Sequence, residues 1–370
     1  MYLIAVIAGI ASAATFVLLL LIAILRHVLG SPRPGLFRRT LWWALALVPV
    51  HVTLTVPATM GWFGSRMVGT RGDERAYLGP RFDADGNWVH QDRDTLKAEA
   101  RPADAPPPPE SPFAVHFASV DGVTLRAFVV EPRQGEPRAT VILVHGLFRG
   151  AMEIETPGAM FRDLGCEVVL LELRNHGGSG RAPATFGFRE ANDVLAAVDF
   201  VRKRPGAAGT RPLILFGVSL GTAAIGFAAP KVEHLAGIVV DAPLADAVAT
   251  AHRMLRDGPR GRAGFTMPQP FRSLALTALE WWSDIDLSAD RPGDSLARVA
   301  PTVPILVIGG GDDHRMLPDE VRALFARLPQ DASHKELWIR EGADHGDVWK
   351  VDPKGYREHL AAFLSRALSR

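Results

Sequence analysis

Residues Leu213–Ala229 read LILFGVSLGTAAIGFAA and carry the clearest structural signal in the sequence. The first part, Leu213–Phe216, is a short apolar run typical of a buried strand, and Thr222–Ala229 has the composition of a helix. Between them lies GVSLG at 217–221, a G-x-S-x-G pattern. In this context the serine occupies a sharp, strained strand-to-helix turn, where glycine on both sides relieves crowding and leaves the hydroxyl exposed. The stretch predicts a nucleophilic serine, Ser219, at the end of a strand.

Short apolar runs recur on both sides of this stretch, separated by segments with helical periodicity. The apolar runs are Val141–Val144, Val168–Leu171, Ile238–Val240 and Ile305–Ile308. Glu190–Arg204 and Pro318–Leu328 space their apolar residues as helices do. Strands that are apolar on both faces and alternate with helices are typical of a mostly parallel sheet flanked by helices. The protein is therefore expected to contain an α/β domain.

A serine hydroxyl needs an imidazole within hydrogen-bond reach, and that imidazole is oriented by a carboxylate. In open parallel sheets such groups gather beyond the carboxyl ends of the strands. Two later strand ends offer them: Ile305–Ile308 leads into GGGDD at 309–313, and Glu336–Arg340 leads into GADHG at 342–346. The order along the sequence is therefore Ser, then Asp, then His.

These motifs resemble the α/β-hydrolase superfamily, whose acid typically follows strand seven in a Gly-x-x-Asp pattern and whose histidine follows strand eight in a Gly-x-x-His-Gly pattern. The resemblance runs from about Phe113 to the C-terminus and implies the α/β-hydrolase fold. It implies Asp313 as the acid and His345 as the base. Asp312 fits the acid spacing equally well, and we favour Asp313 because Pro318, a common element just beyond the acid, then lies nearer its usual distance.

The charge that develops on a carbonyl oxygen during acyl transfer must meet preorganised N–H donors. One candidate is the backbone N–H of Leu220, next to the nucleophile. The other is Leu147 in HGLF at 145–148, which follows an apolar run as the superfamily's His-Gly loop does. We interpret His145 as a loop-shaping residue. The segment LRNHGGSG at 173–180 resembles the superfamily's loop after strand four and is interpreted as structural.

The regions on either side of these motifs complete the domain. Val115–Val120 and Thr124–Val130 flank Asp121-Gly122, which predicts a β-hairpin with a two-residue turn. Residues 242–303 are longer than a simple connection and are expected to form a small lid. The aromatic and aliphatic side chains of the lid suggest acyl-chain substrates; alternatively, they only pack the lid onto the domain.

The N-terminal 65 residues are interpreted as a membrane anchor. No charged side chain occurs from Tyr2 to Leu25, and a helix of ~20 apolar residues spans a bilayer. A second uncharged stretch predicts another span at about 41–63, although its prolines are unfavourable in lipid and a helix on the membrane surface is the alternative. A polar, proline-rich linker at 66–112 leads to the catalytic domain at 113–370.

The position of the basic residues predicts the orientation of this anchor. Four arginines lie between the two uncharged stretches, at 26, 33, 38 and 39, and the positive-inside rule assigns them to the cytoplasm. In a bacterial inner membrane, two spans would make the catalytic domain periplasmic, and one span would make it cytoplasmic.

The composition excludes several other classes of protein. The 370 residues include 41 Lys and Arg against 40 Asp and Glu, so the net charge of +1 provides no field for binding nucleic acid. Cys166 is the only cysteine, which excludes an intrachain disulfide and any multi-cysteine metal site. We expect no metal and no cofactor. The oligomeric state is unknown at this stage.

Together the motifs predict a membrane-anchored serine hydrolase that cleaves carboxylic ester or thioester bonds through Ser219, His345 and Asp313, with lipid-like acyl groups as possible substrates. A peptidase or amidase with the same triad is an alternative, because its attacking groups are identical. A non-catalytic, membrane-tethered binding module is a third interpretation.

Overall fold

A computed structural model describes most of the protein after residue 109. The described residues are 21, 22, 24, 39, 42, 82–83, 86–88, 110–257, 269, 271–287 and 291–369. The protein divides into two compact units. The smaller consists of Met1–Val68, Ala251–Gly258 and Arg262–Asp286, and the larger consists of Gly69–Thr250, Pro259–Gly261 and Leu287–Arg370.

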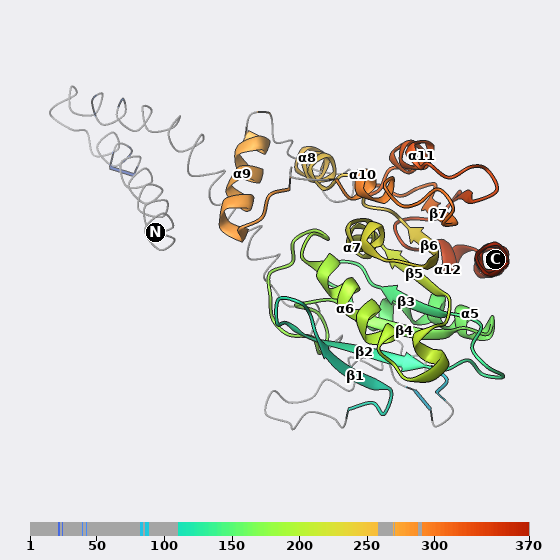
Figure 1. Ribbon diagram of the computed structural model, residues 1–370. Helices are drawn as coiled ribbons and strands as arrows, with labels where there is room; N and C mark the ends of the chain where they lie inside the picture. The colour runs from blue at the N-terminus through green and yellow to red at the C-terminus, as the bar shows by residue number, and fades with distance from the viewer. Residues whose placement is uncertain are drawn as a thin grey trace. The chain divides into compact units, whose positions relative to one another are not determined.

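The larger unit is built on an eight-stranded sheet with the order β1-β2-β4-β3-β5-β6-β7-β8 (Figure 1). The strands are β1 (Ala114–Ala118), β2 (Thr124–Val130), β3 (Thr140–Val144), β4 (Glu167–Glu172), β5 (Leu213–Val218), β6 (Leu235–Asp241), β7 (Ile305–Gly310) and β8 (Lys335–Arg340). Strand β2 pairs antiparallel with β1 and β4, and all the other pairs are parallel. The prediction of an α/β fold with a mostly parallel sheet is confirmed.

Helices cover both faces of the sheet. On one face lie α6 (Glu190–Arg202), α7 (Leu220–Ala228), α10 (Pro292–Leu296) and α11 (Pro318–Arg327). On the other lie α5 (Glu155–Asp163), α12 (Val348–Val351) and α13 (Pro353–Leu368). Alternation along β3 explains this arrangement, since Ile142 and Val144 join the first apolar core while Val141 and Leu143 join the second. Short 3₁₀ turns are η3 (Ala151–Ile154), η4 (Gly206–Gly209) and η5 (Ala229–Lys231).

The segment predicted to be a lid is divided between the two units. Within the larger unit, α10 packs on α7 so closely that a Cβ on Gly226 would lie 2.6 Å from the carbonyl oxygen of Pro292. Helix α8 (Ala247–Asp257) begins in the larger unit and ends in the smaller one, and α9 (Phe271–Ser283) belongs to the smaller unit. Thus at least one part of the predicted lid, α10, is packed within the larger unit.

The predicted membrane spans at 2–25 and 41–63 lie almost entirely outside the described residues. Among the residues that the structure does describe, none belongs to a helix with the length and apolarity needed to cross a bilayer. The two-span and one-span interpretations therefore stay predictions.

The N-terminal hairpin differs from its prediction in one detail. Its two strands are antiparallel neighbours, as expected, but β1 ends at Ala118, so the connection is longer than two residues. The N–H of Gly122 donates to the carbonyl oxygen of Ser119, and Gly122 has φ of +83°. The carboxylate of Asp121 in this connection also pairs with Arg174 at 2.6 Å, which ties the turn to the rest of the domain.

Candidate active site

Ser219 occupies the predicted strand-to-helix turn, between β5 and α7. Its backbone has φ of +52° and ψ of −117°, a conformation that non-glycine residues rarely adopt. A Cβ on Gly221 would lie 2.3 Å from the carbonyl oxygen of Val144, and one on Gly217 would lie 2.7 Å from the backbone of residue 221. The N–H of Ser219 donates to the carbonyl oxygen of Asp241 at 3.0 Å, which connects the turn to the end of β6.

The structure brings Ser219, His345 and Asp313 together beyond the carboxyl ends of β5, β8 and β7. His345 Nε2 lies 2.9 Å from Ser219 Oγ, and His345 Nδ1 lies 2.8 Å from Asp313 Oδ2. With Nδ1–H donating to the carboxylate, Nε2 is left as the acceptor for the serine hydroxyl. The neighbouring Asp344 accepts the backbone N–H of His345 at 2.7 Å and so holds its loop.

Of the two adjacent aspartates left open by the sequence, Asp313 is the one beside the imidazole. Its side chain is buried, and its Oδ1 accepts the backbone N–H groups of Arg315 at 2.7 Å and Met316 at 2.9 Å. These contacts orient the carboxylate so that Oδ2 faces the histidine. Asp312 and His314, by contrast, are exposed.

Leu147, the first predicted oxyanion donor, lies between two backbone amides that are already occupied. The N–H of Gly146 donates to Glu153 Oε2 at 2.6 Å, and the N–H of Phe148 donates to His176 Nε2 at 3.0 Å. No described residue accepts the N–H of Leu147. This amide is therefore available to a ligand.

Leu220, the second predicted donor, is the first residue of α7 and follows Ser219 directly. An amide at the first helical position has no acceptor within its own helix, and the positive end of the helix dipole lies there. A negative charge forming next to Ser219 would be stabilised by both effects.

The two histidines near this loop have structural contacts. His145 is fully buried and accepts the N–H of Leu173 through Nε2 at 3.1 Å. Burial, together with the nearby His176 ring, lowers the pKa of His145 to about 3, so its imidazole is neutral. These contacts fit the predicted loop-shaping role of His145.

The loop at 173–180 is also held by buried contacts. Arg174 is 1% exposed and pairs with Asp193 of α6 at 2.7 Å as well as with Asp121 at 2.6 Å. Asp193 accepts the backbone N–H of Arg174 in addition. The loop thus connects α6 to the hairpin, and its sequence motif is explained by these contacts.

Two carboxyl groups near the imidazole are absent from the sequence interpretation. Glu153 holds the Gly146 amide, and Asp241 accepts the hydroxyl of Tyr356 at 2.8 Å. Burial raises the pKa of Asp241 to about 7 and also raises the pKa of Glu153. Asp241 directly follows the predicted strand Ile238–Val240, which is a signal that could have marked it, whereas nothing in the motifs points to Glu153.

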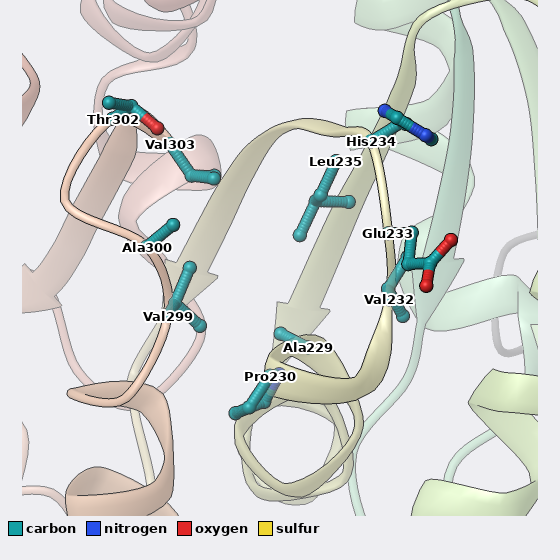
Figure 2. Close-up of a pocket in the computed structure, with 10 residues that line it drawn as sticks. All are labelled: Ala229, Pro230, Val232, Glu233, His234, Leu235, Val299, Ala300, Thr302 and Val303. Carbon is teal, nitrogen blue, oxygen red and sulfur yellow. The ribbon is translucent and has the colours of Figure 1, made fainter.

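A cavity of about 540 Å³ lies at the amino ends of the strands, next to β6 and β7 (Figure 2). It is lined by residues that precede or begin β6 and β7, including Val232, Leu235 and Val303. Ser219 and its partners follow the carboxyl ends of strands, so this cavity is separate from the candidate site. Among the described residues, no cluster of three His, Cys, Asp or Glu side chains could hold a metal ion.

Comparison with known proteins extends the resemblance. The model of the alpha/beta hydrolase family matches residues 141–358. The uncharacterized protein YqkD of Bacillus subtilis is 22% identical over 253 residues, which cover 66% of this chain and 77% of that protein. Among solved structures, the esterase Pf2001 of Pyrococcus furiosus is 21% identical with a TM-score of 0.54, covering 69% of this chain and 92% of its own. The alpha/beta hydrolase GrgF of Penicillium sp. is 18% identical with a TM-score of 0.53, covering 70% and 99%. At these identities the structural likeness concerns the fold.

Proposed function

Because the protein belongs to the alpha/beta hydrolase family, we propose that it is a serine hydrolase that cleaves carboxylic ester or thioester bonds. The observation that carries the proposal is the pair of hydrogen bonds that links Ser219 Oγ to His345 Nε2 at 2.9 Å and His345 Nδ1 to Asp313 Oδ2 at 2.8 Å. A serine hydroxyl is a weak nucleophile at neutral pH, and an oriented imidazole makes it reactive. No described feature of the site calls for a cofactor in this reaction.

In the acylation step, His345 Nε2 takes the proton of Ser219 as Oγ forms a bond to the substrate's carbonyl carbon. The carbonyl electron pair moves onto oxygen, where the N–H groups of Leu147 and Leu220 stabilise the negative charge. The carboxylate of Asp313, bonded to Nδ1, stabilises the imidazolium. When the tetrahedral intermediate collapses, the bond to the alcohol or thiol breaks, the leaving group takes the proton from His345, and the acyl group stays on Ser219.

Deacylation repeats these steps with water as the nucleophile. His345 takes one proton from water as its oxygen bonds to the acyl carbon, and the same two amides stabilise the second oxyanion. Collapse releases the carboxylic acid and returns the proton to Ser219 Oγ. Water is the only co-reactant.

The finer part of the proposal concerns substrate and location. We propose lipid-like acyl substrates and anchoring in a bacterial-type inner membrane through the segments at 2–25 and 41–63. The support is the uncharged, apolar sequence of the first segment and the tryptophans of the second. With two spans the catalytic domain is periplasmic. A reporter active only in the periplasm, fused after Arg370, should then be active; an expressed but inactive fusion would indicate one span.

The proposal of a serine hydrolase is tested with Ser219→Ala. This variant should lose turnover of a short p-nitrophenyl ester and labelling by a fluorophosphonate probe, because both reactions need the Ser219 oxygen. Ser333→Ala is the matched control, since Ser333 lies in the turn that precedes β8, at the amino end of that strand. Undiminished labelling of Ser219→Ala would remove this residue as the nucleophile. Longer acyl chains on the same leaving group would then test the lipid-like preference.

A further inference from the structure

Glu153 lies in the 3₁₀ turn η3 and contacts the loop that carries the proposed oxyanion donor. Its Oε2 accepts the N–H of Gly146 at 2.6 Å, a charge-assisted hydrogen bond when the carboxyl is ionised. A Cβ built on Gly146 would lie 3.0 Å from Glu153 Oε2 and 3.3 Å from Ser219 Cβ. The carboxyl group is therefore separated from the nucleophile by a single glycine.

The loop is constrained on both sides of Leu147. Glu153 holds the amide before it, and His176 Nε2 holds the amide after it, at Phe148, whose φ is +59°. Successive peptide planes share their Cα atoms, so two held planes restrict the direction of the N–H between them. The amide that is free to meet a ligand is the one whose orientation these two contacts determine.

We propose that Glu153 is a positioning residue for this hydrolase: its carboxylate holds the Gly146 amide and thereby aims the N–H of Leu147 at the oxygen that becomes negative in the transition state. This inference rests on the proposed function. A donor aimed at charge that appears only in the transition state contributes to kcat and little to substrate binding.

The same carboxylate is poorly suited to bind a cationic substrate group. Positively charged groups of the protein already face it: Arg149 Nε lies 3.4 Å from Glu153 Oε1, and the charge of Lys350 lowers the pKa of Glu153, as does that of His345 when it becomes an imidazolium. Among the acidic groups, Asp241 lies close enough to Glu153 for the charge of Glu153 to raise the pKa of Asp241. Glu153 Oε2 already accepts the N–H of Gly146, as the positioning role requires. In a subsite for a cationic substrate group, this oxygen would be available to the substrate.

Burial raises the pKa of Glu153 above its ordinary value of 4.5, despite the opposing effects of the Gly146 amide and of Arg149, His345 and Lys350. On protonation the carboxyl becomes a weaker acceptor, and the hydrogen bond to Gly146 loses its charge assistance. The orientation of the Leu147 N–H should therefore be held less firmly at acid pH. This lowers kcat there, in addition to the decrease caused by protonation of the base.

The test compares Glu153→Ala, Glu153→Gln and the matched control Glu155→Gln. Glu155 is buried two residues away, burial raises its pKa to about 8, and its Oε1 has no hydrogen-bond partner among the described residues. Each variant is assayed for kcat and KM with p-nitrophenyl butyrate, for inhibition by a trifluoromethyl ketone, and for its melting temperature. The ketone forms a tetrahedral adduct with the serine and so reports on the oxyanion donors without turnover.

We expect Glu153→Ala to lower kcat by roughly 10- to 100-fold, less than the ~10²–10³-fold loss from deleting a donor outright, with KM changed by less than about threefold. Affinity for the ketone should fall by a similar factor as kcat. Glu153→Gln retains an oxygen acceptor, so it should stay within about fivefold of wild type, and its acid-side midpoint should move to lower pH because the variant has no carboxyl to protonate. Glu155→Gln should match wild type.

The inference is wrong if Glu153→Ala keeps wild-type kcat and ketone affinity, or if KM rises while kcat does not fall. An equal loss in Glu155→Gln would indicate a general effect of changing this turn, and it would also overturn the assignment. If Glu153→Ala does not fold, the pH profile of Glu153→Gln decides. A wild-type protein that neither turns over an ester nor reacts with a fluorophosphonate refutes the proposed function instead, so the two failures are distinguishable.

Discussion

Replacing Asp241 with Asn should make the protein more stable at alkaline pH. The carboxyl group of Asp241 is fully buried at the end of β6, its Oδ2 accepts the Tyr356 hydroxyl at 2.8 Å, and its Oδ1 has no hydrogen-bond partner among the described residues. Burial raises its pKa to about 7, from an ordinary 3.8; Asp313 and Glu153 act in the same direction, and the Tyr356 hydrogen bond and His345 oppose them. The folded protein therefore keeps a proton that the unfolded state releases.

The size of the effect follows from these two pKa values. Between pH 3.8 and about 7 the folded state binds more protons than the unfolded state, so the free energy of unfolding decreases as the pH rises. At 1.36 kcal/mol for each pKa unit, the total loss is about 4 kcal/mol. The contribution is fully present below the unfolded-state pKa and is lost as the pH rises through the folded-state pKa. Asparagine has no proton to release and has nearly the shape of the protonated acid.

The measurement is urea denaturation of wild type and Asp241→Asn at several pH values from about 4 to 8.5. The two proteins should have similar stability at the acid end, and the variant should be more stable by up to about 4 kcal/mol at the alkaline end. Tyr356→Phe removes the hydroxyl that stabilises the ionised form, which raises the folded-state pKa of Asp241 further, so the stability of this variant should keep falling to a higher pH than that of wild type. A stability difference between wild type and Asp241→Asn that does not vary with pH would refute the reasoning.

Three further substitutions test the turn and the acid. Gly221→Ala should destabilise the protein by about 1–3 kcal/mol in the same denaturation assay, because its Cβ would lie 2.3 Å from the carbonyl oxygen of Val144 and strand β3 would have to shift; unchanged stability would contradict so close an approach of the two backbones. Asp313→Asn should lower kcat on a p-nitrophenyl ester by roughly 10⁴-fold, whereas Asp312→Asn should stay within a few-fold of wild type because Asp312 is exposed; the reverse order would assign the acid to Asp312.

The strands of the sheet and the turn that carries Ser219 can be predicted because their sequence signals are local. Apolar runs such as Val141–Val144 are buried on both faces, and no other common element requires that composition over so few residues. GVSLG at 217–221 is equally informative, since the glycines are demanded by backbone contacts within 3 Å. The turn and the strand before it therefore follow from neighbouring residues alone.

Other features depend on contacts between distant segments, and local patterns do not reveal them. Asp312 and Asp313 have the same glycine spacing, and only the backbone N–H groups that follow the second one show which carboxylate is oriented. The hairpin connection at Asp121 is longer than predicted, and the partner of Asp121, Arg174, is 53 residues away, where no local pattern could indicate it. The lid is predicted from length alone, which carries no information about the unit to which each part belongs.

The carboxyl groups around His345 show why hydrogen-bond donors, and not proximity alone, identify the acid. Asp241 ends β6 and Asp313 follows the neighbouring strand β7, and the pKa of Asp241 is raised by the charge of Asp313 and lowered by that of His345. The carboxylate of Asp313 accepts hydrogen bonds from two backbone N–H groups and from His345, and these contacts fix its orientation. The carboxyl of Asp241 accepts only the Tyr356 hydroxyl and leaves one oxygen without a partner among the described residues, so burial dominates and favours the protonated form. Two acids thus lie near one imidazole, and the acid that bonds to His345 Nδ1 is the one whose carboxylate is oriented by backbone donors, Asp313.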